Sequence, residues 1–406
     1  YGLVGSEMCI RDSFMKELKP QNLEDIIAGI SLYRPGPMDF IPQYIKGKNN
    51  PDSITYDCPQ LEPILAPTYG CIVYQEQVMQ IVRDLAGYTL GRSDLLRRAM
   101  SKKKGDVMQK ERQNFVYGNP DEGVPGCIAN GIDEKTANKI YDEMIDFAKY
   151  AFNKSHAAAY AVVSYQTAWL KYYYPVEFMA ALMTSVIDNP GKVSEYIYSC
   201  RQMGIKILPP DINKGEGSFS VDGGNIRYGL AAIKSIGKPV IESIIQERKN
   251  GGEFSNLKDF IERLSGKEVN KRTIESFIKS GAFDSLGGTR KQFMVVYVQI
   301  LDQVNRERKY SMTGQLSLFD IVSDDQKSEF DIPLPDVGEY EKETKLAFEK
   351  EVLGVYISGH PLEEYVATLE KNITRTTADF EVVDGETEPK VKDQERAVIG
   401  GMITGR

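Results

Sequence analysis

The sequence is poor in the residues that build metal sites and disulfide frameworks. It has only two histidines, His156 and His360, and its five cysteines are widely spaced without a CxxC pair. This composition argues against a structural zinc site and against a disulfide-bonded secreted domain. We therefore expect no metal site in this chain and a location in the reducing cytoplasm.

Long apolar runs are also absent. The longest stretch without a charge, residues 157–170, is too short to span a bilayer, and Lys154 and Lys171 flank it. Because there is no signal peptide either, no membrane partner is expected. The sequence contains neither a GxxxxGK[ST] loop nor a GxGxxG fingerprint. Their absence weakens a third hypothesis, that of an unrelated phosphate-binding enzyme.

Length and charge indicate several domains with local rather than global basic surfaces. A chain of 406 residues exceeds one ordinary core, so two or three domains are expected. The net charge of -8 argues against a wholly basic nucleic-acid coat but allows a local basic channel. Residues 1–13 fit nothing downstream and are interpreted as a foreign or artefactual segment. Both ends are interpreted as truncations.

Helical periodicity dominates residues 14–210, with Pro and Gly turns between the helices. Asp133 and Ser155 are expected to cap the helices that follow them, and Pro175 to occupy the first position of another. Residues 211–310 are predicted to form a smaller helical unit and residues 311–343 a linker. A helix is expected to resume near residue 345, within a last segment, 344–406, that ends by entering a β domain.

Two stretches of the first helical region could bind phosphates. Residues 92–112 carry eight Lys/Arg against three Asp/Glu, dominated by Arg97, Arg98 and Lys102–Lys104. Such cations suit polyphosphate or a nucleic-acid backbone, although a solvated basic face is an alternative. Asn153–His156 precede an Ala-rich helix whose free N–H groups attract anions. A capped core helix with a satisfied histidine remains the alternative there.

A further stretch, residues 228–248, resembles a helix-hairpin-helix. Two helical segments are expected to flank a tight turn at residues 235–238, where Gly237 permits close approach and Lys234 and Lys238 add charge. Such a turn would bind a DNA phosphate without reading sequence. An ordinary helical hairpin is the alternative.

The linker contains an apolar segment in an acidic setting. From Asp320 to Glu343 there are nine Asp/Glu against two Lys, yet Leu316, Leu318 and Phe319 immediately precede this stretch. A flexible Gln-Leu-x-Leu-Phe segment can insert its apolar anchors into a partner's pocket. The pattern matches the motif by which bacterial proteins bind the sliding clamp, and a packed edge segment is the alternative.

These stretches occur in the order found in one protein family. The segments "LYRPGPM", "GYTLGRSDLLRRAMSKKK", "FNKSHAAAYAVVSYQTAWLK", "YGLAAIKSIG" and "LGVYISGHPL" closely resemble the bacterial DNA polymerase III alpha subunit, a C-family replicative polymerase. The resemblance extends from about residue 14 to the end. It implies a mainly α fold with polymerase fingers over residues 14–210, a helix-hairpin-helix region, a clamp-binding linker and the start of an OB-fold.

The resemblance also implies roles for individual residues. The nucleotide-binding residues would be Arg97, Arg98, Lys102, Asn153, Lys154, Ser155 and His156. The DNA-binding residues would be Lys234, Gly237 and Lys238, and the clamp-binding residues Gln315, Leu316, Ser317, Leu318 and Phe319. The expected partners are primer-template DNA, the sliding clamp and other replicase subunits, with deoxynucleoside triphosphates as substrates.

One departure from the family concerns catalysis. Two-metal phosphoryl transfer needs adjacent carboxylates, which in this family are palm aspartates, and no Asp-x-Asp lies on an apolar strand here. Mg²⁺ would be held by that missing palm, and the fragment alone is expected to be inactive. The function implied is template-directed DNA synthesis. The alternative is a non-catalytic module that binds DNA and the sliding clamp.

Overall fold

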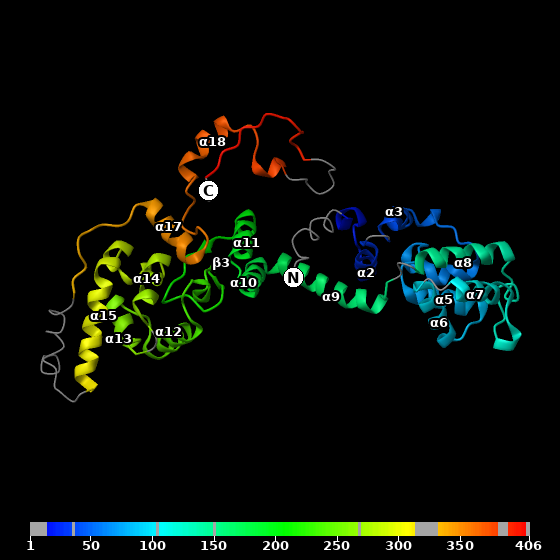
Figure 1. Ribbon diagram of the computed structural model, residues 1–406, viewed down its shortest axis with the longest axis horizontal. Helices are drawn as coiled ribbons and strands as arrows, with labels where there is room; N and C mark the ends of the chain where they lie inside the picture. Colours follow the sequence, from blue (N-terminus) through cyan, green and yellow to red (C-terminus); the bar gives the residue numbers. More distant parts are fainter. Residues whose placement is uncertain are drawn as a thin grey trace. The chain divides into compact units, whose positions relative to one another are not determined.

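The chain folds into two compact units. The computed structural model describes residues 14–34, 37–102, 105–148, 152–266, 269–312, 332–380 and 389–402. Unit 1 comprises Tyr1–Ala168 and Thr377–Glu395, and unit 2 comprises Trp169–Thr376 and Arg396–Arg406. Both are built mostly of helices (Figure 1), which confirms the mainly α prediction. No helix in the described ranges is long and apolar enough to cross a membrane.

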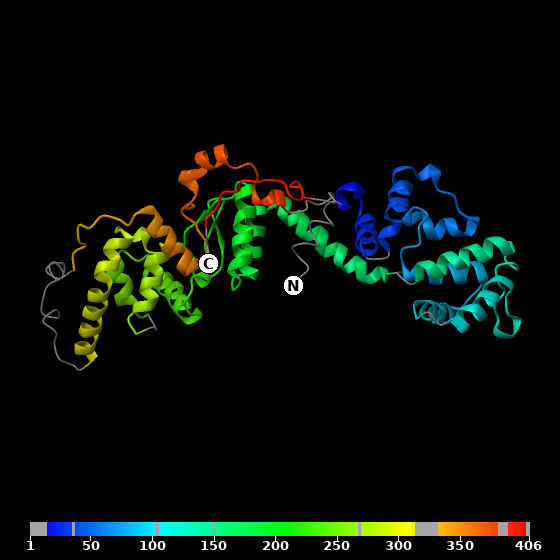
Figure 2. The same ribbon diagram turned by 45° about the horizontal axis from the view of Figure 1, so that its top comes forward.

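Unit 1 contains most of the predicted finger helices. They are α2 (Leu23–Leu32), α3 (Ile41–Asn49), α4 (Glu62–Leu65), α5 (Gln75–Ala86), α6 (Leu90–Ser101), α7 (Gly105–Tyr117), α8 (Glu134–Ala148) and the first part of α9 (Lys154–Tyr173). Helix α5 packs against α6, α7 and α8, and these helices lie together in both views (Figures 1 and 2). A second core joins α2, α3 and the start of α9.

The central position of α5 follows from its sequence. Val78, Ile81, Val82 and Leu85 recur at helical spacing, and each is at most 1% exposed. The Gln77 side chain accepts hydrogen bonds from the backbone N–H groups just before the helix, at 2.8 and 3.0 Å. These bonds fix the entry of the chain into α5 and so the direction of the residues around its N-terminus.

Unit 2 combines helices with a small sheet. Its helices are the rest of α9, α10 (Pro175–Ser185), α11 (Pro190–Gln202), α12 (Lys238–Gly251), α13 (Leu257–Arg263), α14 (Lys271–Ser280), α15 (Arg290–Met312), α17 (Lys342–Leu353) and α18 (Val366–Asn372). The strands are β1 (Ile207–Leu208), β2 (Ser220–Asp222) and β3 (Asn225–Arg227), in the order β1-β3-β2. Strand β3 pairs parallel with β1 and antiparallel with β2. This region was predicted to be helical, and the sheet was not predicted because its strands are too short to show periodicity.

The second half of unit 2 is organised around α14. Helix α14 begins at the cap Asn270, whose side chain accepts from the Thr273 N–H, and packs against α15 and α17. Residues 332–341, within the predicted linker, lie against the start of α15. Pro335 O accepts from the Gln292 side chain at 2.9 Å, and Gly338 O accepts from the Thr289 hydroxyl at 2.7 Å. The helix expected near residue 345 is α17.

The structure tests four sequence predictions of local structure. Asp133 caps α8 by accepting from the Thr136 N–H at 3.0 Å, and Pro175 opens α10, as predicted. Ser155 does not cap α9, because α9 already begins at Lys154 and Asn153 accepts from the His156 N–H at 2.9 Å. The segment before the hairpin turn is a 3-10 turn, Leu230–Ala232, and not a full helix, since Ile233 already has an extended backbone.

Some predictions lie outside the described residues. Residues 1–13 and the clamp-binding residues Gln315–Phe319 belong to this group. Within 344–380 and 389–402 no strand is formed, so the start of an OB-fold stays a prediction. The predicted domain boundaries also stay predictions.

Candidate nucleotide and nucleic-acid sites

On α6, one carboxylate holds two of the predicted nucleotide-binding arginines. Asp94 Oδ1 accepts from Arg97 Nη2 at 2.6 Å, and its Oδ2 accepts from Arg98 Nε at 2.8 Å. The hydrogen bond from Arg97, with the charge of both arginines, lowers the pKa of Asp94 below its ordinary value. The guanidinium of Arg98 remains largely open, at 61% exposed. Asp94 thus presents two cations side by side.

Arg97 also connects α6 to the entry of α9. Its Nη1 donates to Gln75 Oε1 at 2.9 Å, and the Gln75 backbone N–H donates to Phe152 O at 2.9 Å. Tyr74 and Phe152 form a parallel bridge at this place. The fold therefore brings Arg97 close to the Asn153–His156 stretch, which is remote from it in sequence.

Two carboxylates already bind the hydrogen-bond donors of Lys154 at the start of α9. The Lys154 N–H donates to the two carboxylate oxygens of Glu76 at 3.2 and 3.1 Å, and Lys154 Nζ pairs with Glu24 at 2.9 Å. Negative groups are favoured at a helix N-terminus because its N–H groups lack intrahelical acceptors. An anionic ligand arriving here would take the place of Glu76 or Glu24.

Aromatic rings extend this site along α9. The His156 ring lies 4.9 Å from the Tyr160 ring and 5.6 Å from the Phe152 ring, measured between centroids. Arg34 stacks over Phe152 at 4.2 Å, and burial lowers the pKa of its guanidinium. His156 and Tyr160 are both exposed. The rings are therefore open to a ligand with a planar group.

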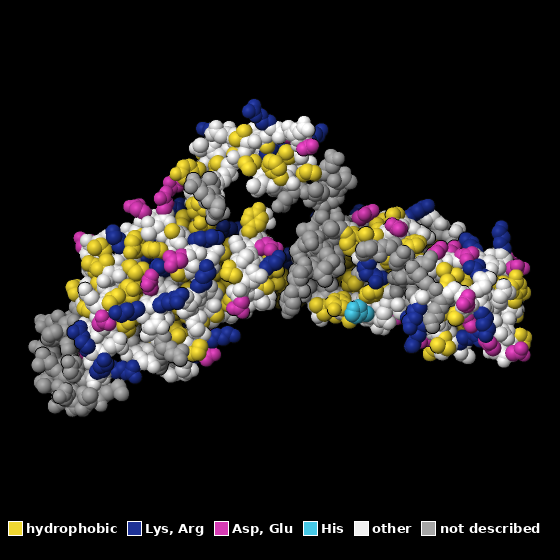
Figure 3. Space-filling model, in the orientation of Figure 1, with side chains coloured by type: hydrophobic (Ala, Val, Ile, Leu, Met, Phe, Trp, Pro, Cys, Tyr) yellow, Lys and Arg dark blue, Asp and Glu magenta, His cyan; other side chains and the backbone are white. Residues whose placement is uncertain are grey.

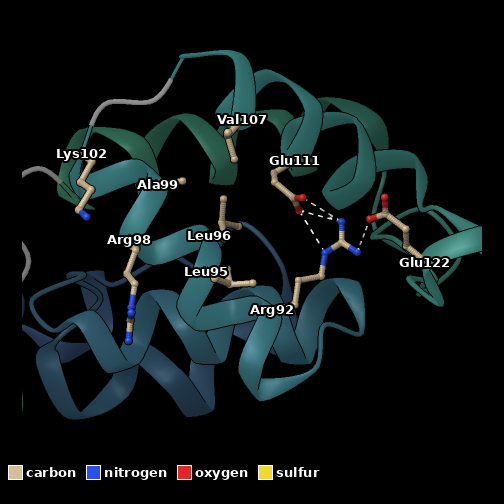
Figure 4. Close-up of a pocket in the computed structure, with 9 residues that line it drawn as sticks. All are labelled: Arg92, Leu95, Leu96, Arg98, Ala99, Lys102, Val107, Glu111 and Glu122. Carbon is tan, nitrogen blue, oxygen red and sulfur yellow. Dashed lines mark hydrogen bonds and ion pairs between the residues drawn. The ribbon is translucent and has the colours of Figure 1, made fainter.

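A pocket of about 480 Å³ lies between α6 and α7 (Figure 4). Leu95, Leu96, Ala99 and Val107 separate its two charged ends, with Arg98 and Lys102 at one end and Arg92, Glu111 and Glu122 at the other.

Arg92 is held between the two glutamates, at 2.9 Å from Glu111 and 2.6 Å from Glu122. Burial lowers the pKa of Arg92, but the bonds to Glu122 and Glu111 outweigh this effect and raise it overall. Arg92 is thus compensated by two carboxylates, whereas at the other end Arg98 shares the single carboxylate of Asp94 with Arg97.

The hairpin turn in unit 2 has the geometry of a phosphate site. Ser235 has a positive φ of 69°, and the exposed Gly237 is the N-cap of α12, so the backbone N–H of Lys238 directly follows an exposed glycine. Lys238, the first residue of α12, is exposed as well. Residue 239 is proline, and the N–H groups of Val240 and Ile241 donate to Gly237 O at 3.1 and 3.3 Å. The Lys238 N–H, beside the Lys238 ammonium, is therefore the backbone donor that this helix start offers to a phosphate oxygen.

Lys234 is already used within the fold. Its backbone N–H donates to Val352 O at 2.8 Å, and its Nζ donates to Glu351 O at 3.0 Å. The Tyr228 hydroxyl donates to Leu353 O at 3.1 Å. Together these donors satisfy carbonyl groups at the C-terminus of α17, which lack intrahelical partners. The hairpin turn is thus fastened to α17.

Gln75, Glu76 and Asp94 were not among the site residues predicted from the sequence. Asp94 stands three and four residues before the two arginines, a spacing that predicts ion pairs on a helix. Glu76 reaches Lys154 across 78 positions, and no local pattern could have indicated that contact.

Comparison with known proteins gives the family of the chain. Residues 6–123 match the bacterial DNA polymerase III alpha subunit finger domain, and residues 204–293 match a helix-hairpin-helix motif. The DNA polymerase III alpha subunit of Thermus aquaticus is 45% identical over 356 residues. This chain belongs to the bacterial DNA polymerase III alpha subunit family.

Two other alpha subunits extend the comparison. That of Vibrio cholerae is 42% identical over 97% of this chain, and that of Escherichia coli is 43% identical over 88%. The aligned segment is 33% of the Vibrio protein, 31% of the Escherichia protein and 28% of the Thermus protein. The chain thus spans about a third of the length of its alpha subunit relatives. The finger match begins at residue 6, inside the segment interpreted as foreign, and includes Arg97, Arg98 and Lys102.

Proposed function

We propose that this chain acts in template-directed DNA synthesis by binding an incoming deoxynucleoside triphosphate in unit 1 and duplex DNA in unit 2. The observation that carries the nucleotide part is that Arg97, which shares Asp94 with Arg98, reaches the start of α9 through Gln75. These groups come from separate stretches of sequence, and each is cationic or a helix N-terminus. A triphosphate carries several negative charges and suits such a cluster.

The chain's own residues supply binding and orientation in this proposal. Arg97 and Arg98 receive phosphate oxygens through their guanidinium forks, and Lys102 adds charge from the end of α6. Asn153, Lys154 and Ser155 offer the N–H groups of the first turn of α9, while His156 lies against the base or sugar. Holding the triphosphate in one geometry reduces the entropy lost on reaching the transition state.

The metal ions expected for this chemistry are not assigned to residues of the chain. In the part of the chain that the structure describes, no three His, Cys, Asp or Glu side chains gather in a way that could hold a metal ion. The residues present do not fit a two-metal centre, so no step of the proposal passes through one. Mg²⁺ bound elsewhere in the complete polymerase stays an expectation of the family resemblance.

Arg98→Ala tests the nucleotide site. Titration of the chain with a deoxynucleoside triphosphate should show at least about tenfold weaker binding, because one charge-assisted contact to phosphate is worth about 1.5–3 kcal/mol. Arg83→Ala is the matched control, since Arg83 is an exposed α5 arginine whose partner is the adjacent Asp84. Equal affinity in the two variants would remove Arg98 from the site. Duplex binding without any nucleotide binding would favour the alternative, a non-catalytic DNA- and clamp-binding module.

The duplex part of the proposal rests on the turn before α12. The backbone N–H and the ammonium of Lys238 would hold a backbone phosphate of primer-template DNA, while Lys234 keeps the turn on α17. Lys238→Ala should weaken binding uniformly across DNA sequences and reduce the salt slope by about one. Fluorescence anisotropy with two unrelated duplexes measures both quantities. A loss confined to one sequence would contradict a backbone contact.

Binding to a sliding clamp and to other replicase subunits is also part of the proposal. It is supported by the sequence Gln315-Leu316-Ser317-Leu318-Phe319 in its acidic surroundings. A tether of this kind raises the effective concentration of the chain at DNA that already carries the clamp.

A further inference from the structure

The apolar middle of the pocket between α6 and α7 is not used by the proposed contacts to a triphosphate. Leu95, Leu96, Ala99 and Val107 form this middle part (Figure 4). Leu95 is 68% exposed and Val107 41% exposed, so both have apolar surface that a ligand could bury. Pockets of this size that combine apolar walls with a few charged groups are typical sites for small organic molecules. The charged groups then decide which kind of molecule fits.

One end of the pocket is balanced in charge. Lys and Arg side chains are mixed with Asp and Glu over the visible face of unit 1 (Figure 3), so each end must be judged by its ion pairs. Arg92 pairs with Glu111 and Glu122, and Lys110 Nζ lies 2.9 Å from Glu122. The bonds from Lys110 and Arg92 lower the pKa of Glu122. Two cations thus meet two carboxylates at this end, and it offers no excess charge to a ligand.

The other end has an excess of positive charge. Arg97 and Arg98 share the single carboxylate of Asp94, and the Arg98 guanidinium is largely exposed. Lys102 is also exposed and forms no ion pair with any residue in the described ranges. Three cations therefore meet one carboxylate. An anionic group is favoured at this end and not at the balanced end.

We propose that the pocket binds an amphipathic organic anion, in which an apolar body carries one carboxylate, sulfonate or phosphate group. The anionic group would bind Arg98 and Lys102 through charge-assisted hydrogen bonds. The apolar body would cover Leu95 and Val107 and remove their surface from water. Because Arg98 and Lys102 are also proposed to hold the triphosphate, such a ligand would compete with the incoming nucleotide. The competition rests on the proposed function, whereas the pocket itself does not.

Two fluorescent probes that differ only in charge test the anionic contact. The full 406-residue chain is titrated with anilinonaphthalene sulfonate and with phenylnaphthylamine, its analogue without the sulfonate. The sulfonate should strengthen binding at least about tenfold, because a hydrogen bond to a charged group is worth more than one between neutral groups. Arg98→Ala should reduce this difference between the probes and leave the affinity for the neutral probe unchanged.

A substitution in the apolar middle tests the pocket as the place of binding. Leu95→Ser should weaken both probes roughly fivefold, because less apolar surface is buried on binding. Leu90→Ser is the matched control, since Leu90 begins the same helix, is 63% exposed and does not line the pocket. In the wild-type chain, a deoxynucleoside triphosphate should displace the sulfonate probe competitively.

The outcomes separate this proposal from the proposed nucleotide site. Equal affinity of Leu95→Ser and Leu90→Ser for the sulfonate probe would overturn the pocket as its site. A triphosphate affinity that falls as much as the probe affinity in Leu95→Ser would place the nucleotide itself in the pocket and overturn a separate ligand. A probe that saturating triphosphate does not displace would overturn the shared cations. Probe binding that depends on Leu95, in a chain that binds no triphosphate, would support the pocket and overturn the nucleotide site together with the competition.

Discussion

Asp94 shows how a single carboxylate can prepare a site for an anion. Each of its oxygens accepts from a different arginine, so the two guanidinium groups are ordered before any ligand arrives. Long, flexible cations lose conformational entropy when they are fixed by a ligand. Because Asp94 already orders both side chains in the folded protein, less conformational entropy is lost when a ligand binds. The carboxylate also reduces the repulsion between Arg97 and Arg98.

The titration of Asp94 tests this arrangement. Its pKa should lie below the ordinary value of 3.8, with the hydrogen bond from Arg97 as the largest cause. The two ion pairs then contribute stability that is present above the unfolded pKa and is lost as the pH falls through the lowered folded pKa. Carboxyl NMR of the chain should show the midpoint rising toward 3.8 in Arg97→Ala, and rising less in Arg98→Ala. A midpoint that neither substitution moves would contradict the shared ion pair.

Among the elements, α17 is the helix that holds the hairpin turn in place. Glu349 of α17 is completely buried, pairs with Arg290 at 3.3 Å and accepts from the N–H groups of Ile357 and Ser358 at 2.9 and 3.0 Å. The C-terminal carbonyls of the same helix receive the donors of Tyr228 and Lys234. Helix α17 is therefore fixed by a buried charge at one point and by the hairpin at another.

Removing the buried carboxylate should loosen this helix. Glu349→Ala leaves the Arg290 guanidinium buried with only Asp284 as its acidic partner, and breaking a buried pair costs about 3–5 kcal/mol. Because Asp284 remains, we expect the lower end of this range in the free energy of unfolding. Hydrogen exchange should show faster amide exchange at Ile357 and Ser358. Glu195→Ala, which removes an exposed pair with Lys192, is the control and should change stability by less than about 1 kcal/mol.

Sequence reasoning succeeded where short-range chemistry decides the structure. The cap of α8 at Asp133 and the start of α10 at Pro175 depend on residues within one turn, and both were predicted. The cap of α9 was placed at Ser155 instead of Asn153, because both residue types suit a cap and only the backbone path distinguishes them. The 3-10 turn before the hairpin was likewise decided by the packing of the turn against α17.

In the candidate sites too, the features that depend on neighbouring residues were predictable, and the features that depend on distant contacts were not. Arg97, Arg98 and Lys238 could be proposed from charge and spacing alone, since a helix places its near neighbours on predictable faces. The ion pair of Lys154 with Glu24 and the hydrogen bond from Lys234 to the backbone carbonyl of Glu351 depend on contacts between distant parts of the chain. Such partners decide which cations are free for a ligand, and they therefore had to come from the structure.

At the scale of the whole molecule, the candidate functions are distributed over different segments. Unit 1 carries the candidate nucleotide site and unit 2 the candidate duplex site. The proposed clamp-binding residues follow α15, and the chain after them returns to the start of α15 through Pro335 and Gly338. The motif is thus connected on both sides to the unit proposed to bind duplex DNA, which would couple clamp and duplex binding through the chain itself.

This connection leads to the last prediction. Titration of the chain with a bacterial sliding clamp should give saturable binding that Gln315→Ala/Phe319→Ala abolishes, since the apolar anchor and its directional hydrogen bond are both lost. Gln326→Ala/Phe330→Ala removes the same residue types from the same acidic stretch and should leave binding unchanged. Equal loss in both variants would mean that the composition of the segment, and not the motif, binds the clamp. Binding that neither variant affects would place the contact elsewhere in the chain, and the apolar residues at 316–319 would then need a packing role within this protein.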